Sequence, residues 1–263
     1  MMDLARRSQI AAMLLALGAL AAAVGYASNP MTQSAQDYAR GVAAASGGLY
    51  LTLRSLNAFL STAQELEVSG GVIVGGSAQP LKVLEPVDDT IERIADVVFL
   101  ILLVTGVVAL AMGPVSAIGF ALLGLTALLT LLPRAPDGRR IAAVRLVGLY
   151  GFVLAIALPL SFLLASVLAD WMTASVWAQH DAILADISAT VAPQIQAQGL
   201  DGWQALLKNV ERYGTLATKI YDRADELVAS FVAILSVLFI KILVLPLVIL
   251  GAITLLARNL ARA

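Results

Sequence analysis

The sequence predicts an all-α, polytopic membrane protein with about four net crossings, one partial or extra apolar helix, and two long amphipathic helical segments outside the lipid. Its 263 residues are 60% hydrophobic and 13% charged, with a mean hydropathy of +0.88, whereas ordinary soluble domains are about 25% charged. Several apolar runs reach the roughly 17–25 residues that a helix needs to cross a bilayer. Because these runs lack the alternation of strands, helices rather than a barrel are expected to satisfy the backbone.

Composition excludes several classes of function. The net charge of −1 leaves no domain-sized basic surface for nucleic acid. The absence of cysteine removes disulfides, thiolate catalysis and cysteine metal sites, and a single histidine rules out a multi-histidine metal site within one chain. Phosphate-binding, nucleophile-elbow, zinc-protease and kinase signatures are missing. We therefore expect no catalytic residue and no cofactor, and a protein that is not an enzyme.

Residues 1–26 read as an uncleaved signal-anchor helix, with Arg6 and Arg7 ahead of a long apolar run. Within this run small residues recur at helical spacing, which allows another helix to approach the backbone closely. These residues are Ala12, Ala16, Ala19 and Ala23.

Residues 27–96 form the first acidic helical segment outside the membrane, with eight acidic and four basic side chains. Apolar residues three and four apart from Tyr38 to Ala63 predict a helix that packs sideways on another. Glycine pairs predict a loop or short hairpin over residues 69–80. A new helix is expected from Pro86, with acidic residues in the first turn, where the helix dipole favours them.

Residues 97–132 are predicted to be a broken pair of apolar helices. The break falls at Gly113-Pro114, which separates a partial helix over 97–112 from a membrane span over 115–132. Proline at the start of the second helix is favourable because its missing N–H is not needed there.

The second half of the chain repeats the plan of the first. An arginine-rich joint over 133–145 precedes a span over 146–168, and a second acidic helical segment over 169–228 again has eight acidic and four basic residues. A long apolar helix over 229–257 contains the last span, and 258–263 is a tail. The matching segments favour two arms on one side of the membrane.

The arginines predict which side this is, because short cytoplasmic loops concentrate Lys and Arg. With both termini and the joint in the cytoplasm of a bacterium, and the helices in its inner membrane, all arginines of the short segments lie inside. They are Arg6, Arg7, Arg134, Arg139, Arg140, Arg145, Arg258 and Arg262. The rival arrangement has five spans and an exported N-terminus, and leaves the first acidic segment inside.

One candidate site lies inside the last apolar run, where Lys241 is the only charged residue. An ionisable side chain at such a place is a functional hypothesis, and Pro246, five residues on, frees a backbone carbonyl that could line a path. No carboxylate lies inside another apolar run. The competing interpretation is a lysine that reaches along the helix to the membrane surface.

Six acidic residues ahead of two apolar runs form a second candidate, because stacked carboxylates attract cations. They are Asp88, Glu92, Asp96, Asp222, Asp225 and Glu226. A divalent-cation site or an acidic vestibule is one interpretation. The other is a solvated, salt-bridged face, since Arg93 and Arg223 lie in the same turns. His180-Asp181 falls on an apolar seam, and we expect a structural role for it.

These features predict a non-enzymatic structural, assembly or interaction subunit that packs its helices against itself or a membrane-protein partner. The apolar helix of 97–112 and 229–240 exceeds what the spans need, which favours a homo-oligomer or a partner complex in the bilayer. The alternative is a channel or transporter subunit, with the acidic residues as its vestibule and Lys241 and Pro246 at the path.

Overall fold

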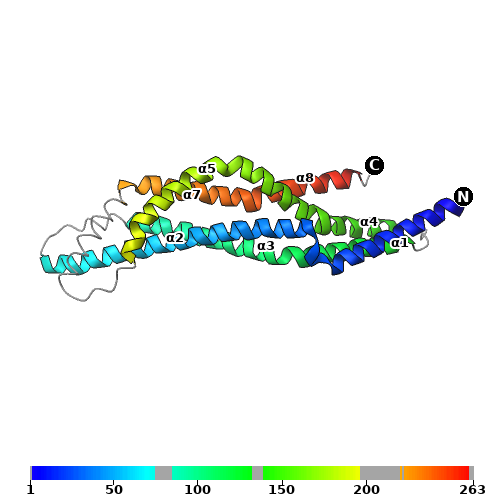
Figure 1. The fold of residues 1–263 in the computed structure, drawn as a ribbon, viewed down its shortest axis with the longest axis horizontal. Coiled ribbons are helices and arrows are strands. Elements are labelled where there is room, and N and C mark those ends of the chain that lie inside the picture. Colours follow the sequence, from blue (N-terminus) through cyan, green and yellow to red (C-terminus); the bar gives the residue numbers. More distant parts are fainter. Residues whose placement is uncertain (1, 75–84, 132–138, 196–219, 221, 261–263) are drawn as a thin grey trace. The chain divides into compact units, whose positions relative to one another are not determined.

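The computed structural model describes all of the chain except residues 1, 75–84, 132–138, 196–219, 221 and 261–263. The described residues are helical, with no strand among them, which confirms the all-α prediction (Figure 1). The elements are α1 (Met2–Val24), the 3-10 turn η1 (Tyr26–Ser28), α2 (Pro30–Val74), α3 (Glu85–Leu131), α4 (Arg139–Phe152), the π turn η3 (Val153–Ala157), α5 (Leu158–Ile195), α7 (Ala224–Phe239), the π turn η4 (Ile240–Val244) and α8 (Leu245–Leu260).

Within the described residues, four helices are long and apolar enough to cross a membrane. They are Arg6–Val24, Glu85–Leu131, Ile141–Asp186 and Ala224–Leu260. The last two pass through the π turns η3 and η4 without a break. A π turn is a local change of hydrogen-bond register, so the helical hydrogen bonding continues through it.

The contacts divide the chain into two units. Unit 1 comprises Met1–Val42, Val104–Trp171 and Ile240–Ala263, and unit 2 comprises Ala43–Leu103 and Met172–Phe239. Within unit 1, the start of α1, the end of α3, the start of α4 and the end of α8 lie at the same end (Figure 1). The arginine-bearing ends of these helices are thus grouped.

Glycines bring two helices of unit 1 into backbone contact. A Cβ added to Gly119 of α3 would overlap the backbone nitrogen of Ala155, and one added to Gly151 of α4 would lie 2.9 Å from the backbone nitrogen of Leu123. Both approaches are too close for any side chain, so glycine is required on both helices.

The predicted small-residue face of α1 is the face that packs. Ala16 is buried, and Gly124 of α3 lies so near that an added Cβ would be 3.4 Å from the Ala16 carbonyl oxygen. The large apolar residues Leu14 and Leu15 point away and are exposed. This arrangement is the close approach that small residues permit in lipid.

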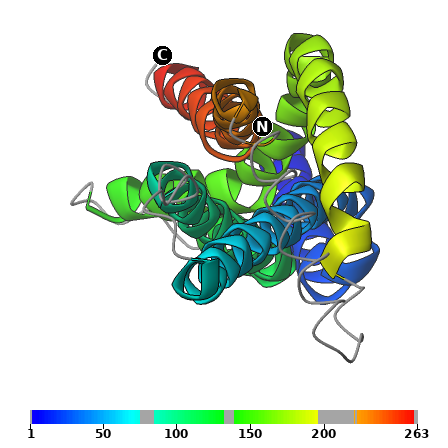
Figure 2. The ribbon, with the colours of Figure 1, turned by 90° about the vertical axis from the view of Figure 1, so that its left-hand side faces the viewer.

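The core of unit 2 confirms the amphipathic pattern of α2. Leu49, Leu53, Leu56 and Leu60, which share the predicted seam, are all buried. Figure 2 shows α2 beside α3 in this unit, and Tyr50 of α2 contacts the ring of Phe99 of α3 at a centroid distance of 5.3 Å.

The predicted break at Gly113-Pro114 is wrong, because α3 runs unbroken from Glu85 to Leu131 with Pro114 inside it. Proline removes the helical donor of the Leu110 carbonyl, four residues earlier. In the same turn, Gln36 Nε2 of α2 donates to the adjacent Ala109 carbonyl oxygen at 3.2 Å, which links α2 to α3 beside the proline. Gly113 leaves room for the Tyr26 ring, which an added Cβ would meet at 3.0 Å.

The loop predicted over residues 69–80 is also wrong in its first half. Helix α2 continues through Gly70-Gly71 to Val74, and residues 75–80 lie outside the described part. A glycine inside a helix costs only about 1 kcal/mol relative to alanine. The pair was therefore too weak a signal to end a helix of 45 residues.

Candidate functional site

Two opposite charges meet in unit 1, where η4 lies against α5. Lys241 Nζ donates to Asp170 Oδ1 at 2.9 Å. The lysine side chain is 19% exposed and the aspartate side chain 74%. Trp171, the next residue, is exposed, as is common for aromatic residues at a membrane interface. Lys241 therefore has a carboxylate partner, which was not anticipated because Asp170 lies just beyond the end of the apolar run before it.

The carbonyl predicted to be free before Pro246 is bound by a side chain of α2. In a π turn a carbonyl accepts from the amide five residues on, and for Lys241 that residue is Pro246, which has no N–H. Tyr38 Oη replaces the missing donor and lies 2.9 Å from the Lys241 carbonyl oxygen. Tyr38 also packs against the buried cluster formed by Ala165, Ala169 and Leu245.

A similar replacement occurs at Pro159. Its missing N–H leaves the Ala155 carbonyl, four residues earlier, without its helical donor. Ser116 Oγ of α3 donates to that carbonyl oxygen at 3.5 Å, and the Thr32 hydroxyl lies 3.1 Å from Ser116 Oγ. Both hydroxyl side chains are fully buried.

The first turns of α2 supply hydrogen bonds beside three prolines of unit 1. Tyr38 binds the Lys241 carbonyl directly, and Gln36 binds the carbonyl of Ala109, next to the one that Pro114 leaves without a donor. Thr32 contacts Ser116 of α3, which in turn donates to the Ala155 carbonyl. Buried polar groups without a partner are costly in an apolar surrounding, and these bonds link α2 to α3 and η4.

Burial raises the pKa of the Tyr38 hydroxyl above its usual value, and the negative charge of Asp170 raises it further. The phenol therefore keeps its proton and remains a donor to the Lys241 carbonyl at any physiological pH.

The acidic residues of α3 face an arginine of α2 in unit 2. Arg54 Nη2 lies 3.3 Å from Asp96 Oδ1, and Arg54 Nη1 lies 3.7 Å from Glu92 Oε1. The same guanidinium donates from Nε to Tyr50 Oη at 3.1 Å. One arginine thus offsets the charge of two of the predicted cluster residues.

Asp88 of α3 has one buried carboxylate oxygen. It lies ahead of the apolar run and is part-buried; Oδ2 accepts from Ser61 Oγ at 3.4 Å, while Oδ1 is buried without a hydrogen-bond partner among the residues that the structure describes. Burial raises the pKa of this carboxyl, and the charges of Glu92 and Asp89 raise it further against the opposing effect of Ser61.

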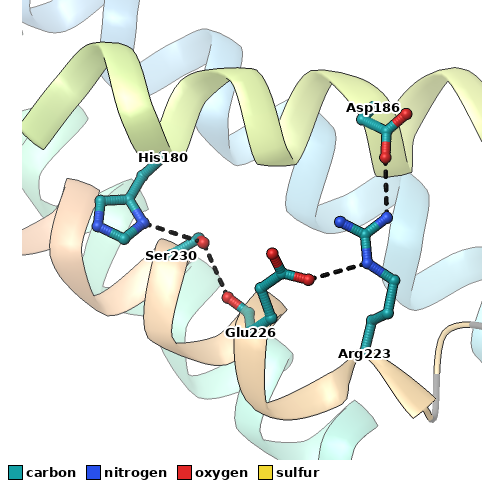
Figure 3. A network of polar contacts seen from close by, with 5 residues as sticks. All are labelled: His180, Asp186, Arg223, Glu226 and Ser230. Carbon is teal, nitrogen blue, oxygen red and sulfur yellow. Dashed lines mark hydrogen bonds and ion pairs between the residues drawn. The ribbon is translucent and has the colours of Figure 1, made fainter.

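The acidic residues of α7 meet a second arginine (Figure 3). Arg223 Nε donates to Glu226 at 2.9 Å, and Nη1 donates to Asp186 of α5 at 2.8 Å. Asp222 and Asp225 are exposed. The two predicted acidic groups therefore lie on different helix pairs, α2 with α3 and α5 with α7, and within the described ranges no group of three or more His, Cys, Asp or Glu side chains could hold a metal ion.

His180 is bound in a way that does not activate a nucleophile. Its Nδ1 lies 3.0 Å from Ser230 Oγ, and Ser230 Oγ donates to the Glu226 carbonyl oxygen at 2.8 Å (Figure 3). Since the serine proton is directed at that carbonyl, His180 Nδ1 carries the proton of their mutual hydrogen bond. A histidine that donates to serine cannot act as its base, so the geometry fits a structural link between α5 and α7.

Sequence reasoning missed three partners: Asp170, Arg54 and Asp186. Each lies far along the chain from the residue it binds, so no local spacing connects them. The sequence held one usable signal for Asp170, because it is an acidic residue beside Trp171 at the end of an apolar run, where a lysine of another apolar helix can meet it.

No protein-family model, no curated protein and no solved structure matches this chain.

Proposed function

We propose that the protein is an integral membrane protein of the bacterial inner membrane that acts without catalysis, as a structural or assembly subunit that binds itself or a partner complex. The observation that carries this proposal is the apolar surface of unit 2, on a helix too long for the bilayer. Helix α3 has 47 residues, which is about 70 Å at 1.5 Å per residue. The hydrocarbon of a bilayer is only about 30 Å thick.

The first turns of the excess length are charged, but the part from Val97 on is apolar and exposed. In unit 2, α3 exposes Val97, Phe99, Leu100 and Leu103, each by at least 43% of its surface. These residues precede the part of α3 in unit 1, whose last 20 residues suffice for a crossing of roughly 30 Å. Soluble surfaces rarely expose such a stripe unless a partner covers it. We call these four residues the α3 stripe.

The arrangement of unit 1 supports four crossings. A continuous α3 leaves no turn at Gly113-Pro114 at which two spans could reverse, and the ends of α1, α3, α4 and α8 are grouped (Figure 1). Arg139, Arg140 and Arg258 lie in these terminal turns. Under the positive-inside rule they face the cytoplasm, and the two acidic arms then share the outer side.

The charged groups of unit 2 favour packing over transport. Arg54 and Arg223 bind acidic residues of neighbouring helices. These arginines neutralise carboxylates that a cation vestibule would need to leave unpaired. Such bridges add little stability at an exposed surface, yet they fix which helix faces which.

The test uses single cysteines, because the chain has none. Leu100→Cys lies in the α3 stripe, and Ser55→Cys, an exposed polar position on α2 of the same unit, is the matched control. With a short bismaleimide applied to native membranes, Leu100→Cys should give a discrete product of higher mass and Ser55→Cys should stay monomeric. Monomer at both positions would contradict the proposal.

The alternative is a channel or transporter subunit, and the observation that favours it is the Lys241 and Asp170 pair inside the apolar unit. Ionisable pairs at such places often mark ion paths. Ion flux through reconstituted protein that falls on Lys241→Ala or Asp222→Ala would favour this alternative. No dependence on either substitution, together with the Leu100 product, favours the assembly subunit.

A further inference from the structure

Unit 1 contains an apolar cavity of about 250 Å³ between α3, α5 and the helix formed by η4 and α8. Val108, Ala111 and Met112 line it from α3, Phe162 from α5, and Leu243 and Leu247 from the last helix. All of its lining residues are apolar. The walls from α5 and α8 begin directly after the π turns η3 and η4, and π turns inside helices are frequent at functional sites.

Water is a poor occupant of this space. A buried water needs about two to four polar partners, and apolar cavities of about 150 Å³ stay dry and bind apolar molecules. The exposed lining surface is almost entirely carbon. An empty cavity forfeits the contacts of its walls, so an apolar occupant is favoured.

The cavity is open to the surface of unit 1. Val104, Leu243 and Leu247 line it and are themselves 37% to 57% exposed. A flexible methylene chain can follow an open apolar cavity of this kind and needs no polar partner.

We propose that this cavity binds an acyl chain of a membrane lipid. The inference rests on the proposed membrane placement, because the bilayer then surrounds the mouth with hydrocarbon chains. The exposed apolar residues Val107, Leu110 and Val248 near the lining positions face the same phase. The bound chain completes the packing of α3, α5 and α8 at the level of their π turns and Pro246.

The experiment reconstitutes the full chain into phosphatidylcholine vesicles that contain a small fraction of phosphatidylcholine with a photoreactive diazirine in the middle of its acyl chain. Labelled residues are mapped by mass spectrometry after irradiation. The decisive position is Met112, which lines the cavity but is only 2% exposed. Leu14 and Leu15 of α1, both exposed, report general contact with lipid.

Ala111→Phe fills the cavity, and Ala121→Phe is the matched control at an exposed position of α3 outside the lining. We expect labelling of Met112 in the wild type and in Ala121→Phe, and loss to background in Ala111→Phe with labelling of α1 unchanged. Ala111→Leu, a smaller replacement that protects the measurement if the phenylalanine variant misfolds, should give a partial loss. Circular dichroism checks the fold of each variant.

Three results would overturn the proposal, and they have different consequences for the membrane placement. The bound acyl chain is refuted, and the membrane placement retained, by either of two results. One is labelling of α1 without labelling of Met112, and the other is labelling of Met112 that Ala111→Phe leaves unchanged. Absence of labelling at α1 as well refutes the membrane placement and the bound chain together.

Discussion

A single methyl group at Gly119 should separate the helices of unit 1. Relative to the backbone of η3, the added Cβ of Gly119→Ala would overlap the nitrogen of Ala155 and lie 2.7 Å from the carbonyl carbon of Leu154. Favourable carbon contacts need about 3.5–4.0 Å, so the helices must move apart by about 1 Å. The same substitution at Gly106, also in the part of α3 that belongs to unit 1, meets nothing within 4 Å.

The two alanine substitutions should therefore change the free energy of unfolding in opposite directions. Gly106→Ala should stabilise the helix by up to about 1 kcal/mol, whereas overpacking at Gly119 should cost about 1–3 kcal/mol or more. The expected difference is about 1–4 kcal/mol, given these two terms. Helicity measured during titration with sodium dodecyl sulfate in mild detergent gives the two free energies of unfolding. Equal midpoints for the two variants would refute backbone contact between α3 and η3.

Three further substitutions test the polar contacts. Asp170→Asn should lower the free energy of unfolding by about 1–3 kcal/mol, between the values for exposed and buried ion pairs, because it leaves Lys241 with a neutral partner. The control Asp37→Asn, in an exposed ion pair of unit 1, should change the free energy of unfolding by at most about 0.5 kcal/mol. Equal losses for the two variants would contradict this prediction. Tyr38→Phe should lower the free energy of unfolding by about 1 kcal/mol near pH 7. Because the pKa of this phenol is raised in the folded protein, its contribution to stability is present below the ordinary pKa near 10 and declines above it. The stability difference between wild type and Tyr38→Phe should therefore narrow in alkaline solution, and a difference that does not change with pH would contradict this. The pKa of Asp88 in the folded protein is raised from its ordinary value of 3.8. The folded state therefore holds this proton more tightly than the unfolded state, and stability falls as the pH rises through the raised pKa. Asp88→Asn should raise the melting temperature at pH 7 and have no such effect near pH 3, whereas a lower melting temperature at pH 7 would show that the carboxylate is stabilising.

Local periodicity was sufficient for much of the fold. The seam of α2 was read from residues three and four apart, and Leu53 and Leu60 are buried as that spacing requires. The face of small residues on α1 was read in the same way, and Ala16 packs on α3. Both succeed because a helix face depends only on spacing within one segment.

Continuity of α3 could not be read locally. Gly113-Pro114 is a strong breaking signal within its own segment, yet α3 continues through it, and Gln36 of α2 binds the Ala109 carbonyl in the turn before the proline. The sequence carries no mark of that long-range bond. The same holds at Pro246, where the free carbonyl was anticipated but its donor, Tyr38, lies more than two hundred residues away.

The candidate site residues were found as charges without their partners. Glu92 and Glu226 were identified from their spacing ahead of apolar runs, yet Arg54 and Asp186, which complete their contacts, come from helices that only the fold brings near. Charge patterning on one helix predicts an exposed acidic face. It cannot predict which cation of another helix faces it.

The orientation of the arginine-bearing ends is the claim on which the proposed function depends, and accessibility of single cysteines tests it most directly. Variants Gly75→Cys, Gly138→Cys and Gly199→Cys are exposed in intact cells to a maleimide that cannot cross the membrane. The account predicts that positions 75 and 199 react and that position 138 reacts only after the cells are permeabilised. Reaction of position 138 in intact cells, or reaction of only one of the other two, would contradict a pair of exported arms and the assembly role proposed for them.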